Sequence, residues 1–396
     1  MKKILIIGAG FLQDFVIRKA VSMGYETLAV DADPDAIGFR HASKYAVINI
    51  VDENACLDYA RKEKIDGVLT AATDYGVLTA AYIAQEMGLP GLKYEVAQLI
   101  KNKYKVRKQL FEKQVDDSEQ AYIIDENTDV IKLAPELVYP VMVKPCDGSG
   151  SRGASRVDNA EKLEEACRYA MAGSISRRAE IETFISGQEY GAESLVIDGK
   201  VHVMAIMKKW MTNPPYYAEL GHAIPSGLPC GLEDKARLYV EKAIRTLGIN
   251  HGAVNMDMII TEDNKIYIVD IGARMGGNLI GSHIIPYGTG IDYMGSLIRI
   301  TAGDQADIRP DVHQAVATRL LAFREGIIKK MPNMQAVEKQ YDVEIYHHIT
   351  EGMLVNNYRT NLDGCGYIVA KAENMEKAVQ KAEQAKSEIE CICFGS

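Results

Sequence analysis

The segment "IITEDNKIYIVDIGARMGG", residues 259–277, contains two apolar stretches joined by a run of turn-forming residues. The polar residues 262–265 are flanked by alternating β-branched and apolar residues, which predicts a β-hairpin. A two-residue turn at Asp263-Asn264 would pair Asp257, from the upstream strand "NMDMII", with Asp270 on the same face of the ribbon. The hairpin therefore brings two carboxylates together on one side of a sheet.

Two opposed carboxylates need a partner. Directly paired residues have Cβ atoms about 4.5–5.5 Å apart, and like charges at that separation are destabilising. Such a pair persists when a proton is shared or when a cation lies between the two groups. Arg274 is too far along the strand to neutralise both, so we predict a bound cation.

Length, composition and net charge restrict the class of protein to which the chain can belong. The chain has 396 residues, 47% hydrophobic and 25% charged, with a net charge of −9. The length predicts two or three domains, and the acidic balance argues against nucleic-acid and membrane partners. The start "MKKILIIGAG" is interpreted as a strand entering a glycine turn, not as a signal peptide. Seven cysteines without metal-ligand spacing fit a reducing cytoplasm.

The order of predicted elements gives an α/β protein with three parts. Residues 1–95 alternate short apolar strands with helices, which predicts a doubly wound parallel sheet. Residues 96–305 form a second domain of mixed strands and helices, with a lid subdomain at about 136–205. Residues 306–396 predict a small antiparallel sheet with one packed helix.

The turn "GAGFLQ" after the first strand partly matches a dinucleotide fingerprint. Gly8 and Gly10 occupy the first two glycine positions, and Asp31 ends the second strand where a ribose-binding acid is expected. Gln13 stands where the third glycine belongs. Three interpretations stay open: an NAD site, a purely structural turn, and a contact between Gly10 and a small substrate.

The stretch "YPVMVKPCDGSGSRG", residues 139–153, combines a buried strand carrying Lys144 with a glycine-rich loop. Glycines let backbone N–H groups surround a phosphate, Ser149 and Ser151 add hydroxyl donors around Gly150, and the lysine adds a charge. The lysine precedes the glycines, so this is not a Walker loop. The alternative is a flexible surface loop.

Two further segments are ambiguous by themselves. Lys103 begins the basic helix of "NKYKVRK", which alone is typical of a solvated face. In "IETFISGQEYG", residues 181–191, Glu182 and Glu189 flank the apolar step Phe184-Ile185. The backbone of that step could bind an adenine edge and the second acid a ribose, or both acids could simply lie on a surface hairpin.

Together these segments resemble the ATP-grasp superfamily over nearly the whole chain, and most of all its carboxylate–amine ligases: biotin carboxylase, carbamoyl phosphate synthetase, the purine-biosynthetic ligases and the L-amino-acid ligases. The resemblance implies a pre-ATP-grasp domain, an ATP-grasp domain and a small C-terminal domain. It implies that ATP is bound by Lys103, Lys144, Ser149, Gly150, Ser151, Glu182, Phe184, Ile185 and Glu189. It also implies that Asp257 and Asp270 bind Mg²⁺, with Mn²⁺ as an alternative, and that Arg274 holds the acyl phosphate. Lys144 is a further predicted catalytic residue, as is Asn278, whose amide in "RMGGN" lies close to Arg274 and is suited to binding an anionic group.

The chain departs from the family pattern at two positions. Asp270 replaces the usual glutamate, and Gly272 replaces a usual ligand asparagine. The register predicted above places Asn255 opposite Gly272, which gives the hypothesis that the Asn255 amide completes the octahedral shell of Mg²⁺. The alternative is the loss of one metal site. The substrate contacts that we predict are Gly10, Asp74, Glu219, His222, Gly276 and Gly277.

The implied reaction joins a small carboxylate to an amine. ATP phosphorylates the carboxylate, an amine attacks the acyl phosphate, and ADP and phosphate are released, without a nucleophilic side chain. An amino-acid ligase is the first expectation and a purine-pathway ligase the second. An NAD(P)-dependent oxidoreductase and a non-catalytic ATP-binding sensor are the alternatives from other classes. We expect small-molecule substrates, a homodimer and a cytoplasmic location.

Overall fold

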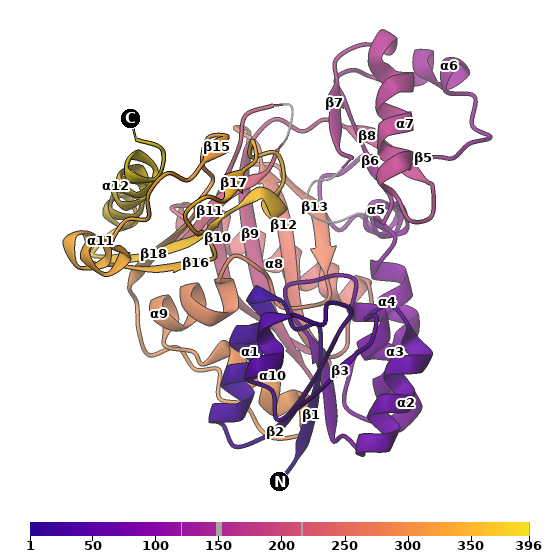
Figure 1. Ribbon diagram of the computed structural model, residues 1–396. Coiled ribbons are helices and arrows are strands. Elements are labelled where there is room, and N and C mark those ends of the chain that lie inside the picture. Colours follow the sequence, from indigo (N-terminus) through magenta and orange to yellow (C-terminus); the bar gives the residue numbers. More distant parts are fainter. Residues whose placement is uncertain (120, 148–152, 215–216, 396) are drawn as a thin grey trace.

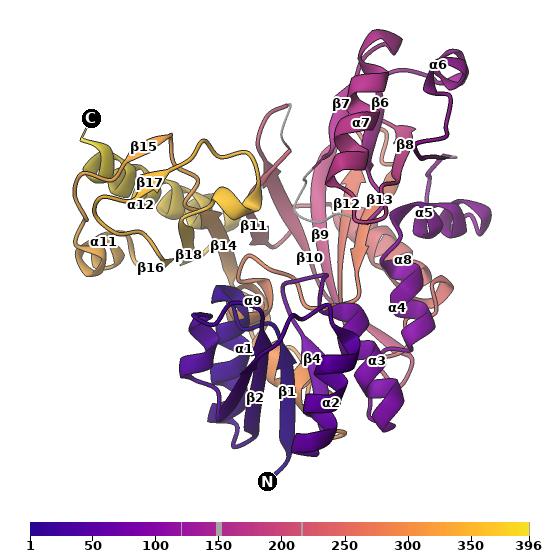
Figure 2. The ribbon, with the colours of Figure 1, turned by 45° about the vertical axis from the view of Figure 1, so that its right-hand side comes forward.

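The computed structural model of the chain describes residues 1–119, 121–147, 153–214 and 217–395. Among these residues, no helix combines the length and apolar character needed to cross a membrane. The N-terminal domain (indigo) lies beneath a long central sheet, a small sheet (magenta) projects at the top, and the C-terminal region (yellow) lies at one side (Figures 1 and 2).

The N-terminal domain is a parallel sheet with the strand order β3-β2-β1-β4. Its elements are β1 (Lys3–Ile7), α1 (Phe11–Ser22), β2 (Glu26–Asp31), η1 (Ile37–Arg40), β3 (Lys44–Val47), α2 (Glu53–Glu63), β4 (Gly67–Thr70) and α3 (Val77–Met87). Ile4 and Ile6 share a core with α1, whereas Leu5 and Ile7 share one with α2 and α3. Both faces of the sheet are therefore covered, which explains why its strands are continuous apolar runs. The predicted doubly wound domain is confirmed.

Two helices lead from this domain to the small sheet, whose order is β5-β8-β6-β7. The elements are α4 (Tyr94–Ile100), α5 (Lys103–Glu112), β5 (Tyr122–Ile124), α6 (Val130–Leu133), η2 (Ala134–Glu136), β6 (Val141–Pro145), β7 (Ser155–Val157), η3 (Ala160–Lys162), α7 (Leu163–Gly173) and β8 (Ala179–Thr183). This sheet does not coincide with the lid expected at about 136–205, because it includes β5 and ends with β8.

The large sheet has eight strands in the order β13-β12-β9-β10-β11-β14-β18-β16. Its strands are β9 (Gln188–Ile197), β10 (Lys200–Met211), β11 (Glu219–Ile224), β12 (Gly252–Ile260), β13 (Ile266–Gly272), β14 (Ala315–Leu320), β16 (Val343–His347) and β18 (Gly366–Ala372). The antiparallel strands predicted beyond residue 306 are present, but pairing of β11 with β14 makes them a continuation of this sheet.

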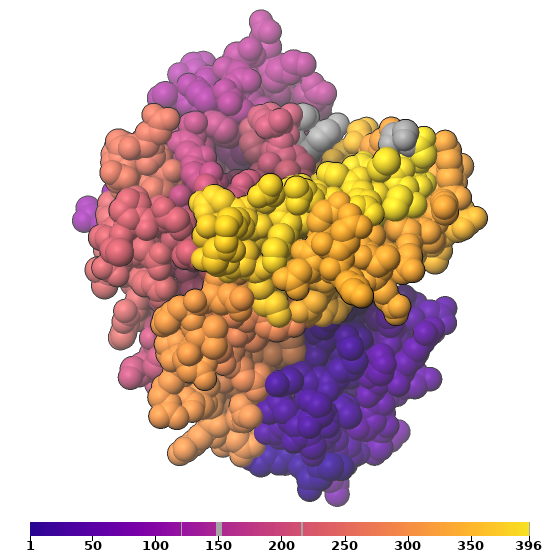
Figure 3. Space-filling model, turned by 90° about the vertical axis from the view of Figure 1, so that its left-hand side faces the viewer, coloured from indigo at the N-terminus to yellow at the C-terminus, as the bar shows by residue number. Residues whose placement is uncertain are grey.

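The remaining elements cover the large sheet and its C-terminal extension. They are α8 (Cys230–Thr246), η4 (Ile280–Ile284), α9 (Ile285–Thr289), α10 (Tyr293–Thr301), β15 (Gly326–Ile327), α11 (Met334–Tyr341), β17 (Leu354–Val355), η5 (Asn361–Asp363) and α12 (Met375–Phe394). Met256, Met258 and Ile260 of β12 share a core with α8. The alternate residues of β12 therefore point to the opposite face. Figure 3 shows the C-terminal region, orange and yellow, against the N-terminal domain.

The β12–β13 hairpin has the predicted pairs but not the predicted turn. Asp257 pairs with Asp270 and Asn255 with Gly272, as expected, but Met258 pairs with Ile268. The turn holds three residues, 262–264, closed by a hydrogen bond from Thr261 N to Lys265 O at 3.0 Å. The extra turn residue shifts the register by one, and a bulge at Val269 shifts it back. The prediction of a two-residue turn is wrong, and the bulge cancels its effect at the aspartates.

Candidate active site

A cavity of about 850 Å³ lies where the N-terminal domain, the small sheet, the large sheet and the C-terminal region meet. Most of the predicted site residues line it: Asp74, Lys103, Lys144, Glu182, Phe184, Ile185, Glu189, Glu219, His222, Asn255, Asp257, Asp270, Arg274, Gly277 and Asn278. Gly10 and Gly276 are not among its lining residues. Ser149, Gly150 and Ser151 fall outside the described residues.

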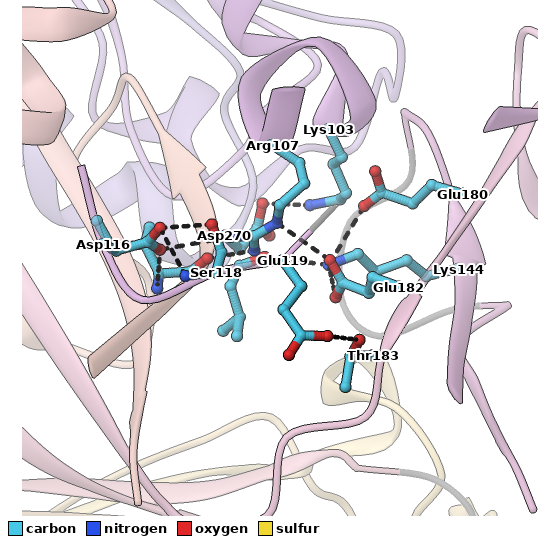
Figure 4. Close-up of polar contacts among 12 residues, drawn as sticks. Lys103, Arg107, Asp116, Ser118, Glu119, Lys144, Glu180, Glu182, Thr183 and Asp270 are labelled. Carbon is cyan, nitrogen blue, oxygen red and sulfur yellow. Dashed lines mark hydrogen bonds and ion pairs between the residues drawn. The ribbon is translucent and has the colours of Figure 1, made fainter. Parts of the chain in front are cut away.

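One end of the cavity is built from β6, β8 and α5 (Figure 4). Lys144 Nζ contacts Glu182 Oε1 at 2.6 Å and lies 3.3 Å from Glu180 Oε1. Because β6 and β8 are antiparallel neighbours, Lys144 is directly paired with Glu180. The backbone N–H of Phe184 donates to Pro140 O at 3.1 Å, so this donor of the expected adenine contact already has a partner.

Arg107 is a site residue that the sequence analysis missed. Its guanidinium is buried and its Nε donates to Glu182 Oε2 at 3.2 Å, while Nη2 donates to Ile268 O on β13. Arg107 follows Lys103 by four residues, so both side chains project from the same face of α5. That spacing in "KYKVRK" was the available signal. Arg107 thus connects α5, the small sheet and the β12–β13 hairpin (Figure 4).

The two opposed aspartates each contact a lysine. Lys103 forms an ion pair with Asp270. Lys209 Nζ lies 2.9 Å from Asp257 Oδ2, 2.6 Å from Glu219 Oε1 and 3.7 Å from Glu189 Oε2. Lys209 could not be singled out from the sequence, because "MKKW" contains two lysines and only strand alternation decides which of them faces the cavity.

Burial and the neighbouring charges shift the pKa values of Glu189 and Glu219 in opposite directions. Burial raises the pKa of Glu189 to about 7, against the opposing effect of Lys209. Burial would also raise the pKa of Glu219, but Lys209, His222 and the hydrogen bond from Asn278 together outweigh burial and hold that pKa at about 2. Glu219 is therefore ionised at neutral pH, and Asn278 and Asn361 both donate amide hydrogens to it. Burial lowers the pKa of His222 to about 4, so its ring is neutral.

Arg274 is held from two domains. Its Nε and Nη2 lie 2.9 and 3.1 Å from the two oxygens of Asp74, which follows β4 of the N-terminal domain. Its Nη1 donates to Asn255 Oδ1 at 3.2 Å, and Asn255 Nδ2 donates to Glu193 Oε2 at 3.0 Å. Both polar atoms of the Asn255 amide therefore have protein partners, and its role as a metal ligand stays a prediction.

Glu193 is a third site residue that could not be singled out from the sequence. It is fully buried on β9 and accepts hydrogen bonds from Gly276 N at 2.9 Å and Tyr293 OH at 2.8 Å. Gly276, predicted to contact substrate, instead donates its N–H to this carboxylate. Glu193 thereby fixes the loop after Arg274. Its signal was the alternation with Glu189, four residues earlier on the same face of the strand.

The Gln13 side chain packs against the N-terminal glycine turn. The Gln13 side chain is buried, donates to Ala71 O at 2.6 Å and lies against Gly8 and Gly10, where an added Cβ would meet it at 3.3 and 3.0 Å. Asp31 accepts hydrogen bonds from Ala9 N and Asp33 N. The acid that could bind a ribose is therefore tied to its own turn, which supports the structural interpretation.

Comparison with known proteins identifies two parts of the chain. Residues 137–282 match the ATP-grasp domain family, and residues 319–392 match the L-amino acid ligase C-terminal domain 2. Residues 137–282 therefore form an ATP-grasp domain. The matches to an ATP-grasp domain and to a ligase C-terminal domain agree with the predicted carboxylate–amine ligase type.

Solved structures share this ATP-grasp architecture along the whole chain. The L-amino acid ligase from Bacillus licheniformis has a TM-score of 0.84 and 23% identity, and phosphoribosylglycinamide synthetase from Anaerococcus prevotii has 0.78 and 22%, each covering 98% of both chains. Formate-dependent phosphoribosylglycinamide formyltransferase of Sulfurisphaera tokodaii is 24% identical, covering 98% of this chain and 96% of the relative. The structural likenesses confirm the predicted fold class.

Proposed function

We propose that this ATP-grasp protein is an ATP- and Mg²⁺-dependent ligase that joins an amino acid, or a similar small carboxylate, to an amine through an acyl phosphate. The observation that carries the proposal is the pair Asp257–Asp270, which faces a cavity also bordered by Lys103, Lys144 and Arg274. This arrangement suits phosphoryl transfer, which depends on positioning and on cations around the transferred group.

The donor set fits magnesium. Two aspartate side chains face the same cavity, and carboxylate oxygens are ligands that Mg²⁺ prefers. Among the described residues, no group of three or more His, Cys, Asp or Glu side chains could hold a metal. Asp257 and Asp270 would therefore hold the ion together with nucleotide phosphates and water. Bound there, Mg²⁺ would supply positive charge next to the transferred phosphoryl group.

In the proposed reaction, a carboxylate oxygen attacks the γ-phosphorus of ATP, and the bond to the bridging oxygen of ADP breaks. Lys103 and Lys144 would bind the phosphates, and Arg274 would hold the acyl phosphate after leaving Asp74. The amine nitrogen then attacks the acyl carbon, loses a proton, and expels phosphate. The product is an amide. The N-terminal domain, the small sheet, the large sheet and the C-terminal region surround the cavity and would keep water away from the acyl phosphate.

Charge at the acceptor end supports an amino acid over a ribose phosphate. Among the described residues that line the cavity, each lysine and arginine lies near a carboxylate: Lys103–Asp270, Lys144–Glu182, Arg156–Asp158, Lys209–Glu219 and Arg274–Asp74. Lys103, Lys144 and Arg274 are assigned above to ATP and the acyl phosphate, which leaves only Arg156 and Lys209 among these described residues for a ribose phosphate. The match of residues 319–392 to the L-amino acid ligase domain supports the same substrate class. We also propose a homodimer, which the mass in solution would test.

The test uses pools of amino acids with ¹⁸O in their carboxyl groups, together with ATP and Mg²⁺. Transfer through an acyl phosphate carries one ¹⁸O into the released phosphate, which mass spectrometry detects. Asp270→Asn should abolish the release, whereas Asp263→Asn, at the exposed tip of the same hairpin, should not change it. ATP binding without carboxylate-dependent release would contradict the proposed activity, and release dependent on a ribose phosphate would favour the purine-pathway alternative.

A further inference from the structure

The cavity has an aromatic wall that takes no part in the phosphoryl transfer described above. Phe11, at the start of α1, lines the cavity together with His348 and Tyr367 of the C-terminal region. The rings of Phe11 and Tyr367 are stacked, with an interplanar angle of 11° and centroids 6.3 Å apart. The ring centroids of Phe11 and His348 are 6.1 Å apart. We call these three residues the aromatic wall.

The aromatic wall is supported by two further rings. Phe15, one helical turn after Phe11, has its ring centroid 5.8 Å from that of Phe11 and 5.5 Å from that of Tyr346. Tyr346 of β16 pairs with Tyr367 of the neighbouring strand β18. Neither Phe15 nor Tyr346 is among the described residues that line the cavity. The wall is therefore fixed by the N-terminal domain and the C-terminal region together, and a preformed surface reduces the ordering entropy lost on binding.

A leucine of the C-terminal region adds to the apolar lining. Leu362 lies in the turn η5 and lines the cavity, although the residue is 76% exposed. Asn361 holds the turn to β11, because its Oδ1 accepts from Glu219 N at 3.0 Å and its Nδ2 donates to Glu219 Oε2 at 3.0 Å. Thr360 and Asp363 close the turn with a capping box. Leu362 is thus held where a ligand in the cavity would bury it, and burial of an apolar side chain is favourable.

Carboxyl groups outnumber cations beside the aromatic wall. Burial and the charge of Glu219 raise the pKa of Tyr367, which agrees with a position of this carboxylate close to the wall. Lys209, 2.6 Å from Glu219, is shared with Glu189 and Asp257. An acyl phosphate would be repelled from Glu219, whereas an amine can donate hydrogen bonds to it. The space beside the wall therefore favours the amine over the activated carboxylate.

We propose that the aromatic wall and Leu362 bind the side chain of the amine partner, which is a primary amine carrying an aromatic or large apolar group. The inference rests on the proposed ligase function and names the class of its second substrate. Glu219 would accept a hydrogen bond from the amine nitrogen, while the apolar group packs on the rings of Phe11 and Tyr367. Aromatic pairs add to the free energy gained from burial alone, so an aromatic group is favoured most.

Calorimetry with two amides tests the proposal. Phenylalanine amide and alanine amide have no free carboxylate to activate, so they can bind only as amines, and they differ by one phenyl group. The wild type should bind phenylalanine amide at least about tenfold more tightly, which is the range for added apolar groups in a pocket. Leu362→Ala should lower this preference about fourfold or more, as for loss of one buried methylene group. Leu354→Ala, at an exposed leucine of the same region that is not among the described cavity residues, is the control and should leave the preference unchanged.

Two variants of α1 separate binding from a structural role of the rings. Phe11→Ala and Phe15→Ala each remove one ring from the same cluster, so both should lower stability in urea unfolding. Only Phe11→Ala should lose the preference for phenylalanine amide. If Phe11→Ala does not fold, Leu362→Ala, at its exposed position, still decides. Equal affinities of the wild type for the two amides, or a preference unchanged in Leu362→Ala, would overturn the proposal.

The amide measurement does not depend on turnover, so the two proposals fail separately. A wild type that prefers phenylalanine amide but shows no carboxylate-dependent phosphate release would refute the ligase function and support the apolar subsite. Release that is equally fast with both amides as the amine partner would support the ligase function and overturn the apolar subsite.

Discussion

At the scale of single residues, Gly272 shows why this site departs from its family. A side chain at position 272 would start in the space filled by the Asp74–Arg274 ion pair, since an added Cβ would lie 2.9 Å from Asp74 Oδ1 and 3.1 Å from Arg274 Cζ. The glycine therefore makes room for a carboxylate from another domain. The sequence showed the missing asparagine but not the residue that had taken its place.

We expect Gly272→Asn to lower the free energy of unfolding by about 1–3 kcal/mol, because the new side chain overpacks this contact. Adding Asp74→Ala in the same chain should recover part of the loss, with a coupling of at least about 0.5 kcal/mol. Urea denaturation measures both. Gly231→Asn, where an added Cβ meets nothing within 4 Å, is the control. Additive losses in the double variant would contradict the explanation.

At the scale of elements, α5 and the β12–β13 hairpin carry many of the charged side chains in and around the cavity. Lys103 and Arg107 leave one face of α5, toward Asp270 and toward Glu182. In the hairpin, strand alternation puts Asn255, Asp257 and Ile259 in the cavity and their neighbours in the core. The periodicities of helix and strand thus sort polar from apolar residues.

Arg107→Met should lower the free energy of unfolding by about 3–5 kcal/mol, because it removes the ion-pair partner of the buried Asp116 and one of the two cations beside Glu182. It should also weaken ADP binding, since Glu182 loses one of its two cations. Lys108→Met, on the exposed side of the same helix, is expected to change stability by less than about 0.5 kcal/mol. Urea titration and calorimetry of ADP binding check the pair of variants, and equal effects would refute the role of Arg107.

At the scale of the whole molecule, the cavity exists only because distant segments meet. His283 illustrates such a junction: its ring packs 5.5 Å from Phe15 of the N-terminal domain and 4.7 Å from Tyr346 of the C-terminal region, with Nε2 2.8 Å from Tyr346 OH. Burial lowers the pKa of His283 to about 4, as it does for His222. These two rings are neutral where the domains come together.

A fall in pH should therefore lower the free energy of unfolding through these two histidines. Between pH 6.5 and about 4 the unfolded chain binds more protons than the folded one at each ring, so stability falls as the pH falls. At pH 5 each ring should have lost about 2 kcal/mol relative to pH 7. His283→Phe should remove its share of that loss in urea unfolding at the two pH values. His313→Gln, at an exposed position, is the control and should not change the loss of stability between pH 7 and pH 5. If His283→Phe also left that loss unchanged, the pH effect would not come from His283.

The sequence by itself determined the elements and much of the local site. Apolar runs in the first strands, the alternation in the hairpin and the ordered segments around Lys103, Lys144 and Glu182 were sufficient for the fold class and for a cluster of opposed aspartates. These features depend on neighbours within a few residues, and backbone geometry alone fixes their faces. The predicted length of the turn was wrong. A three-residue turn followed by a bulge at Val269 pairs the two aspartates just as a two-residue turn would, and the bulge cannot be recognised in the sequence pattern.

Only the tertiary structure decided which charges meet. Asp74 lies 200 residues from Arg274. Arg107 of α5 reaches Glu182 of the small sheet, and Lys209 reaches carboxylates on three other strands of the large sheet. A lysine in "KK" or an aspartate after a strand has the same local signature whether it faces solvent or a carboxylate. Burial and the opposite charge beside it come from packing of distant segments, and it is these that set the pKa of each acid and the charge balance of the cavity.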